Sequence, residues 1–397
     1  MPGLAEVLRR GAAATLREQP LSPAQAKAWR AICACRTPAL GGQQMACAAC
    51  GHQHWHYHSC RNRHCPQCGA RAKDTWLRGR LADVLDVPYA HLVFTLPHEL
   101  NSLYRARPRW LIATLFASVA ATLDTFAANP RWMGSAGGQG AFSLVLHTWS
   151  QNLSQHLHLH AVMACGVLGQ DGQWHRPLRQ PDFLFPVRAL SRVFRAKFMQ
   201  ALRALAKQSD APADPNLSPA GRKALHRHDW VVYAKTPLGG AAQVLSYLSR
   251  YSHRTAIGNE RILAVSDEEV VFSVRADDQG GKRRMRLPMA EFIRRFLQHV
   301  LPDGVQRIRH YGVLANGCKK TQLARARQAL NQPPPNPRAL ESAQAFMARV
   351  ARIEIGLCPH CKGPLHVAAT LAPQRRQLPA PGWPIAATAQ QQARAPP

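Results

Sequence analysis

The spacing of apolar positions along the chain changes repeatedly between the helical period and the alternating period of strands. We expect helices at residues 4–32, 73–87, 108–128, 190–207, 243–257, 291–300 and 319–330. Runs rich in β-branched and aromatic residues predict strands at 91–96, 141–149, 158–167, 230–234, 265–274 and 282–287. The pattern therefore indicates a protein in which helices and strands are interspersed along the whole chain.

One predicted strand carries histidines at alternate positions. Because alternate side chains of an extended strand share a face, His156, His158 and His160 should project together. A turn at residues 150–153 would place His147 across a hairpin from His158 and His160, close enough to share an ion with them. The pattern favours a metal site over the alternative, a polar strand face on which the histidines have no common task.

The predicted helix at residues 243–257 carries a second set of reactive side chains. Tyr247 and Tyr251 are four positions apart and Arg254 follows three later, so all three share one helical face. We interpret them as a pair of nucleophilic tyrosines beside an arginine that can hold a phosphate. The alternative is a packing stripe, but a packing stripe does not need a cationic neighbour such as Arg250.

Two Cys-x-x-Cys pairs, Cys47/Cys50 and Cys65/Cys68, are separated by fourteen residues. Each pair can offer two thiolates from one tight turn, and two such knuckles close a tetrahedral zinc site. The spacing is typical of metal binding rather than of a disulfide framework. We therefore expect a structural zinc ion held by these four cysteines.

Further cysteines are left over by this assignment. Cys35, Cys60 and His64 could hold a second zinc with a histidine from residues 52–58, or they could be ordinary residues of the knuckles. A last pair, Cys358 and Cys361, supplies only two thiolates. It would need His360, His366 or a partner chain to complete a site, or it binds nothing.

The charge balance indicates a polyanionic partner. Lys and Arg number 51 against 22 Asp and Glu, which gives a formal net charge of +29. Nucleic acid is the first candidate for such a surplus, and the alternative is a basic surface that only keeps the protein in solution. Arg61 and Arg63 lie beside the cysteine knuckles, where they could contact DNA phosphates.

The cysteine usage and the start of the chain indicate a reducing compartment. No apolar signal segment follows the charged first ten residues, and the apolar window at 111–128 contains Asp124 and predicts a buried helix rather than a membrane span. We expect a bacterial cytoplasmic protein that associates with the nucleoid and not with a membrane.

Several motifs together resemble a known family. They are Cys60-Arg-Asn-Arg-His-Cys-Pro-Gln-Cys68, Val93-Phe-Thr-Leu-Pro-His-Glu99, His158-Leu-His160, Tyr247-Leu-Ser-Arg-Tyr251 with Arg254-Thr-Ala-Ile257, and Arg307-Ile-Arg-His-Tyr-Gly312. In order and spacing they resemble the IS91-type transposases, which belong to the HUH endonucleases of rolling-circle transposition, replication and conjugation. The motifs extend over most of the chain.

The resemblance implies an α+β fold, with a zinc-binding domain before an HUH nuclease core that has a central antiparallel sheet flanked by helices. The implied organisation is a helical lead-in and zinc-binding DNA-binding domain at 1–87, the catalytic domain at 88–330, a linker with the last Cys-x-x-Cys pair at 331–372, and a disordered tail at 373–397.

The resemblance also implies a chemistry. His147, His158 and His160 would hold a catalytic Mg²⁺ or Mn²⁺, with His147 as the third ligand in place of His156. Tyr247 and Tyr251 would nick and rejoin single-stranded transposon ends through a 5′-phosphotyrosine bond, with Arg254 beside them. Two alternatives remain: a plasmid replication initiator or relaxase with the same chemistry, and a zinc-dependent DNA-binding regulator without catalysis.

Overall fold

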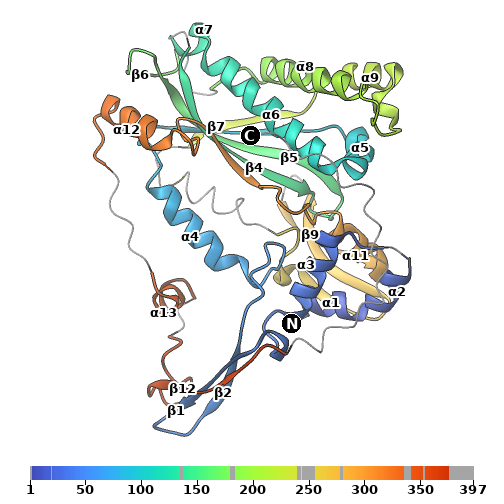
Figure 1. The fold of residues 1–397 in the computed structure, drawn as a ribbon, viewed down its shortest axis with the longest axis vertical. Helices are drawn as coiled ribbons and strands as arrows, with labels where there is room; N and C mark the ends of the chain where they lie inside the picture. The colour runs from blue at the N-terminus through green and yellow to red at the C-terminus, as the bar shows by residue number, and fades with distance from the viewer. Residues whose placement is uncertain are drawn as a thin grey trace.

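The computed structural model describes residues 2–18, 20–134, 137–178, 184–238, 243, 255–277, 280–334, 341–351 and 354–374. Three antiparallel sheets lie within these residues, and helices cover two of them (Figure 1). The expected α+β class is confirmed. The short 3₁₀ and π turns are η1 (Pro38–Leu40), η2 (His98–Leu100), η3 (Pro215–Leu217), η4 (Asn259–Arg261) and η5 (Met347–Ala351).

The largest sheet has the strand order β11-β4-β5-β3-β7, with every neighbouring pair antiparallel. Its strands are β3 (Tyr89–Thr95), β4 (Gln139–Trp149), β5 (Gln155–Leu168), β7 (Val232–Leu238) and β11 (Ile308–Gly312), and β6 (Trp174–His175) pairs with the end of β5. The long β4–β5 hairpin is central, so the predicted histidine hairpin lies in the middle of the sheet.

Helices cover one face of this sheet (Figure 1). They are α5 (Asn101–Ala106), α6 (Pro108–Ala127), α7 (Pro130–Met133), α8 (Val187–Leu205) and α9 (Pro219–His226). Phe94 and Leu159 from the sheet pack with Phe116 and Phe194 from α6 and α8 in the main core. Among the described helices, α6 is long and apolar enough by composition to cross a membrane, but its buried side packs in this core.

A second sheet, in the order β10-β9-β8, packs with the N-terminal helices. Its elements are α1 (Leu4–Arg10), α2 (Ala12–Glu18), α3 (Pro23–Ala34), β8 (Ile262–Val265), β9 (Glu269–Asp277), β10 (Gly280–Pro288) and α11 (Met289–Leu297). Ser22 and Gln25 form a capping box that starts α3, whose Trp29 is buried in one core with Phe272 and Phe292. The first helices therefore pack with residues more than 200 positions later.

The third sheet joins the two ends of the described chain. Strand β1 (Gly42–Cys47) pairs with β2 (Gln53–Tyr57) on one side and with β12 (Leu365–Leu371) on the other. Helix α4 (Gly69–Leu81) leads back to the main sheet, α12 (Lys319–Ala329) lies near the end of α4, and α13 (Ala343–Phe346) precedes β12. The predicted domain boundaries at residues 87, 330 and 372 stay a prediction. The pairing of β1 with β12 joins the first predicted domain to the segment at 331–372.

Candidate functional site

The histidine hairpin has the predicted register. In the β4–β5 pair, His147 stands directly opposite His158, and Val145 stands opposite His160. The connecting turn is closed by Ser150 and Ser154, where the N–H of Ser150 donates to the carbonyl of Ser154 at 3.0 Å. This local turn fixes which residues of the two strands face each other.

Three histidines converge on one point of the hairpin. The potential ligand atoms of His147, His158 and His160 all lie within 4.8 Å of one another. The ring centroids are 4.5 Å apart for His147 and His160, and 5.0 Å apart for His158 and His160. His156 lies outside this group, beside the ring of His98 at 5.3 Å. The structure thus groups His147, and not His156, with His158 and His160.

Neighbouring groups orient two of these rings. Nδ1 of His158 lies 3.0 Å from the backbone carbonyl of His156, and a carbonyl can only accept, so Nδ1 carries the proton and Nε2 is free for a ligand role. Nδ1 of His160 lies 2.9 Å from Nε2 of His91. Partners that fix the tautomer of a histidine in this way are typical of metal ligands.

Burial keeps two imidazoles of this region neutral at pH 7, those of His158 and His91. Burial, with a smaller effect of His156, lowers the pKa of His158 to about 4. Burial and the positive charge of Lys235 lower the pKa of His91 to about 3. Only the neutral ring offers a lone pair to a cation, so these rings are in the form that binds metal at neutral pH.

The histidines occupy the sheet face opposite the main core. Leu157 and Leu159 alternate with them and point into that core. Tyr233, on β7, stands opposite Val93, which in turn stands opposite His160, so Tyr233 shares the histidine face and is 52% exposed there. Four predicted site residues lie outside the described part of the chain: Tyr247, Tyr251, Arg254 and Arg250.

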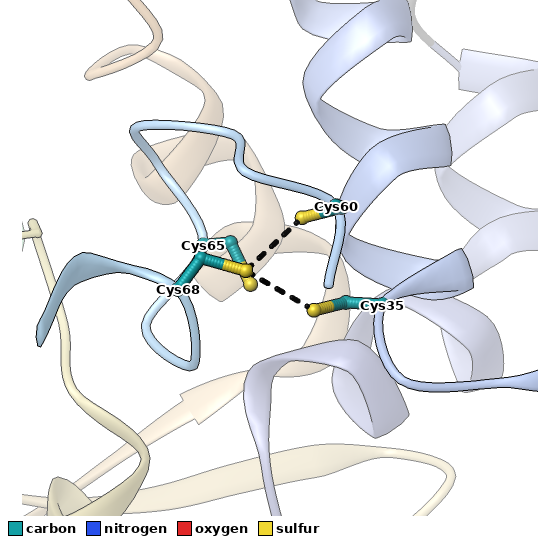
Figure 2. A group of neighbouring side chains, drawn as sticks. All are labelled: Cys35, Cys60, Cys65 and Cys68. Atoms are coloured by element: carbon teal, nitrogen blue, oxygen red, sulfur yellow. Dashed lines mark hydrogen bonds between the residues drawn. The ribbon is translucent and has the colours of Figure 1, made fainter. Parts of the chain in front are cut away.

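The cysteines form two clusters, and neither has the predicted membership. Cys65 and Cys68 meet Cys35 and Cys60 (Figure 2). The sulfur of Cys68 lies 3.3 Å from that of Cys35 and 3.6 Å from that of Cys60. Of the two alternatives left open for Cys35 and Cys60, a separate second zinc site with His64 is wrong within the described structure.

The other predicted pair, Cys47 and Cys50, meets Cys358 and Cys361 instead of Cys65 and Cys68. The sulfurs of Cys47 and Cys361 are 3.4 Å apart, and those of Cys50 and Cys358 are 3.6 Å apart. Sequence spacing identifies each knuckle but not its partner, because any two knuckles can close a site once the fold brings them together. The prediction of one site from Cys47, Cys50, Cys65 and Cys68 is therefore corrected.

The first cluster has the donors and the size for zinc. Four thiolates at about 2.3 Å from one zinc ion stand about 3.8 Å apart, close to the separations of these sulfurs. Hydrogen bonds within the cluster lower the pKa of the Cys35 thiol and raise the pKa of the Cys60 and Cys65 thiols. A bound metal would favour the thiolate form of all four. His64 is half-buried and is not part of this cluster, and burial lowers its pKa to about 3.

Arg63, one of the two predicted DNA contacts, also makes structural hydrogen bonds. Its guanidinium donates to the carbonyls of Val305 at 2.7 Å, Pro302 at 3.1 Å and Leu301 at 3.3 Å, which ties the zinc loop to the start of β11. Arg61 is exposed and has a left-handed backbone with φ 52°. The DNA contacts predicted for Arg61 and Arg63 stay predictions.

Arg61 borders a basic hollow along α4. The cavity measures about 740 Å³, and its lining includes Arg61, Arg71, Arg80 and the ring of Trp76. Arg80 is paired with Asp83 at 2.8 Å, whereas Arg61 and Arg71 are exposed. Cationic side chains beside an aromatic ring are a common arrangement for nucleic acid, with phosphates on the cations and a base against the ring.

Sequence reasoning missed His91 as a neighbour of the histidine cluster. In the sequence, His91 is a single histidine at the start of a predicted apolar strand. The pairing of β3 with β5 brings it next to His160. It also missed Trp149, whose ring stacks on His147 at 4.8 Å and lies under the guanidinium of Arg307.

Two family models match the chain. A model described as "Transposase zinc-binding domain", of the IS91 type, matches residues 7–96, and one described as "Putative transposase" matches residues 140–322. The first spans the whole Cys35/Cys60/Cys65/Cys68 cluster, so this part of the chain is a zinc-binding domain and the cluster supports a structural zinc ion. The second spans the histidine hairpin.

Curated relatives agree with these models. "Putative transposase y4qJ" of Sinorhizobium fredii is 39% identical over 374 residues, which cover 91% of this chain and 93% of the relative. "Transposase for insertion sequence element IS801" of Pseudomonas savastanoi pv. phaseolicola is 27% identical, over 82% of this chain and 78% of the relative. With both domains matched and a relative that aligns over nearly its full length, the chain belongs to the IS91-type transposases.

Proposed function

We propose that this transposase is an HUH endonuclease that nicks and rejoins single-stranded DNA at the ends of its element. The observation that carries the proposal is the convergence of His147, His158 and His160, whose ligand atoms lie within 4.8 Å of one another on the sheet face opposite the main core. A non-catalytic DNA-binding regulator needs no such cluster. The family membership favours transposition over plasmid replication or conjugation.

The three histidines fit a divalent cation by their chemistry. Burial keeps the His158 ring neutral, and the proton on its Nδ1 leaves Nε2 as its donor atom. His147, His158 and His160 would hold the Mg²⁺ or Mn²⁺ ion. When bound, the ion would polarise the scissile phosphate and neutralise the charge that develops on it.

Tyr247 and Tyr251 would supply the nucleophile. The oxygen of one tyrosine forms a bond to phosphorus, the bond from phosphorus to the 3′ oxygen breaks, and that oxygen gains a proton and leaves as a 3′-OH. The 5′ side of the nick stays on the tyrosine, and the reverse step rejoins it to a 3′-OH without loss of the phosphodiester energy. A second tyrosine would let one site hold two strands in turn.

Arginine side chains would favour the tyrosine phenolate and bind the phosphates of the DNA. An unperturbed tyrosine has a pKa near 10, so a cation such as Arg254 or Arg250 would be needed to favour its phenolate at neutral pH. Away from the histidines, Arg61 and Arg71 would guide the strand along α4, and Trp76 would offer its ring to a base.

The test is formation of a covalent adduct by the full-length protein. Single-stranded oligonucleotides that carry the ends of the element are labelled at the 3′ end, because the strand 3′ of the nick is the one that stays on the tyrosine. His158→Ala should abolish the labelled protein band in Mg²⁺ or Mn²⁺. His156→Ala, two positions away on the same face, should retain it. An adduct of wild-type yield with His158→Ala would refute the proposed site.

A further inference from the structure

The cluster of Cys47, Cys50, Cys358 and Cys361 lies partly outside the residues that the zinc-binding family model matches. Cys47 and Cys50 fall within residues 7–96, whereas Cys358 and Cys361 come from beyond both matched regions. The four sulfurs lie within 4.8 Å of one another, and all four cysteines are free. Their nearest separations of 3.4 and 3.6 Å suit four ligands of one zinc ion.

The two knuckles have the same backbone geometry. In each, the fourth residue after the first cysteine donates its N–H to that cysteine's carbonyl, at 3.0 Å for Gly51 to Cys47 and 3.0 Å for Lys362 to Cys358. Both donors have left-handed backbone, with φ 72° for Gly51 and 62° for Lys362. A non-glycine residue rarely adopts this conformation. Its recurrence at Lys362 indicates that the second knuckle is shaped for the same task as the first.

A glycine beside the sulfurs supports this interpretation. The N–H of Gly363 points to the sulfur of Cys361 at 3.4 Å, the role of a donor that stabilises a thiolate. A side chain at this position would start 3.3 Å from the sulfur of Cys361, 3.4 Å from that of Cys47 and 3.0 Å from Ala49. With a Cβ at this position the neighbouring atoms of the two knuckles would have to move by a few tenths of an ångström.

The sheet around these knuckles has little apolar core to hold it. Five of the seven residues of β12 are exposed, among them Val367 at 49%, and three of the five residues of β2 are exposed. A small sheet of this kind gains too little from burial to be stable by itself and needs a metal or another staple. The cluster lies where β1 meets the start of β12, since Cys47 pairs with Leu365.

We propose that Cys47, Cys50, Cys358 and Cys361 bind a second structural zinc ion, which fastens the C-terminal strand β12 to the N-terminal hairpin β1–β2. The site unites residues 308 positions apart. Its loss detaches the C-terminal segment from the zinc-binding domain while the first cluster and the histidine hairpin keep their structure. The proposal is independent of the nuclease chemistry proposed above.

The zinc content of the full-length protein tests the pairing of the cysteines. Cys358→Ser with Cys361→Ser should lose one zinc per chain relative to wild type. Cys47→Ser with Cys361→Ser, one change in each knuckle, should also lose only one, because both act on the same site. Cys60→Ser with Cys361→Ser should lose two. Cys318→Ser, outside both clusters, is the matched control and should lose none.

Hydrogen exchange of the same proteins tests the fastening. The amides of β12 should exchange at least about tenfold faster in the Cys358→Ser, Cys361→Ser protein, while those of β5 keep their wild-type rates, which also shows that the protein is folded. Unchanged zinc content in that protein, a loss of two zinc ions from the Cys47→Ser, Cys361→Ser protein, or wild-type exchange in β12 would each overturn the proposal.

Discussion

Nδ1 of His160 lies 2.9 Å from Nε2 of His91, and both side chains are buried. The two residues come from neighbouring strands of the main sheet, and their rings are stacked with centroids 5.2 Å apart. Because this contact occupies Nδ1 of His160, it leaves Nε2 as the donor atom toward His147 and His158. His91 is therefore a positioning residue for the proposed metal site.

Replacement of His91 by Ala should weaken divalent-ion binding without removing it. Loss of a partner of this kind typically costs about 10–100-fold in metal affinity. Mn²⁺ titration of the full-length protein, followed by electron paramagnetic resonance, measures the change directly. His310→Ala is the control, because His310 is a buried histidine of the same sheet that bonds to Ser143 and not to the cluster. Equal Mn²⁺ affinity of the His91 variant and wild type would refute the positioning role.

A second buried histidine predicts a pH dependence of stability. His299 is 2% exposed, donates from Nε2 to the carbonyl of Leu153 at 3.0 Å, and accepts at Nδ1 from Thr148 at 3.2 Å. Burial lowers its pKa to about 4, against about 6.5 for an unfolded histidine. Between these values the unfolded chain binds more protons, so the free energy of unfolding falls as the pH drops from about 6.5 to about 4.

The glutamine variant isolates this effect. His299→Gln can keep both hydrogen bonds but does not titrate. Over the same pH range its free energy of unfolding should therefore fall less than that of wild type. The difference between the two decreases should be at most about 3 kcal/mol. Urea unfolding at several pH values gives both profiles. If the free energy of unfolding depended on pH equally in both proteins, His299 would not be the source of the predicted pH dependence.

The hollow along α4 predicts a salt-dependent loss of DNA binding. Arg61→Ala and Arg71→Ala should each weaken binding to single-stranded DNA about equally for all sequences and lower the slope of log affinity against log salt by about 0.7. Fluorescence anisotropy at several salt concentrations measures both quantities. Arg294→Ala is the control, since Arg294 is also exposed but is paired with Glu291 at 2.6 Å. If both variants kept the wild-type slope of log affinity against log salt, the DNA would bind outside this hollow.

The parts of the fold predicted from sequence are those encoded by local pattern. The alternation of His158 and His160 with Leu157 and Leu159 identified the strand and the face of the sheet, because a period of two places these sets on opposite sides. The helix at α6 followed from its apolar spacing in the same way.

The parts that sequence reasoning missed depend on long-range contacts or on polar strands. Strand β2 has the sequence Gln-His-Trp-His-Tyr, which carries little apolar signal, and β12 acquires its partner only when the chain folds back on β1. The predicted grouping of the cysteines into zinc sites is wrong for the same reason. Sequence spacing identifies each knuckle, but the fold determines which two knuckles come together. His91 reaches His160 only through strand pairing.

The proposed reaction is an attack on DNA by a tyrosine of the 247–251 motif at the histidine cluster. Peptide mapping of the covalent adduct by mass spectrometry tests it most directly. The nucleotide remnant should lie on Tyr247 or Tyr251. Tyr247→Phe with Tyr251→Phe should form no adduct, and Tyr233→Phe, a change on the exposed tyrosine of the histidine face, should form it normally. A remnant on Tyr233, or an adduct that persists in the double variant, would contradict it.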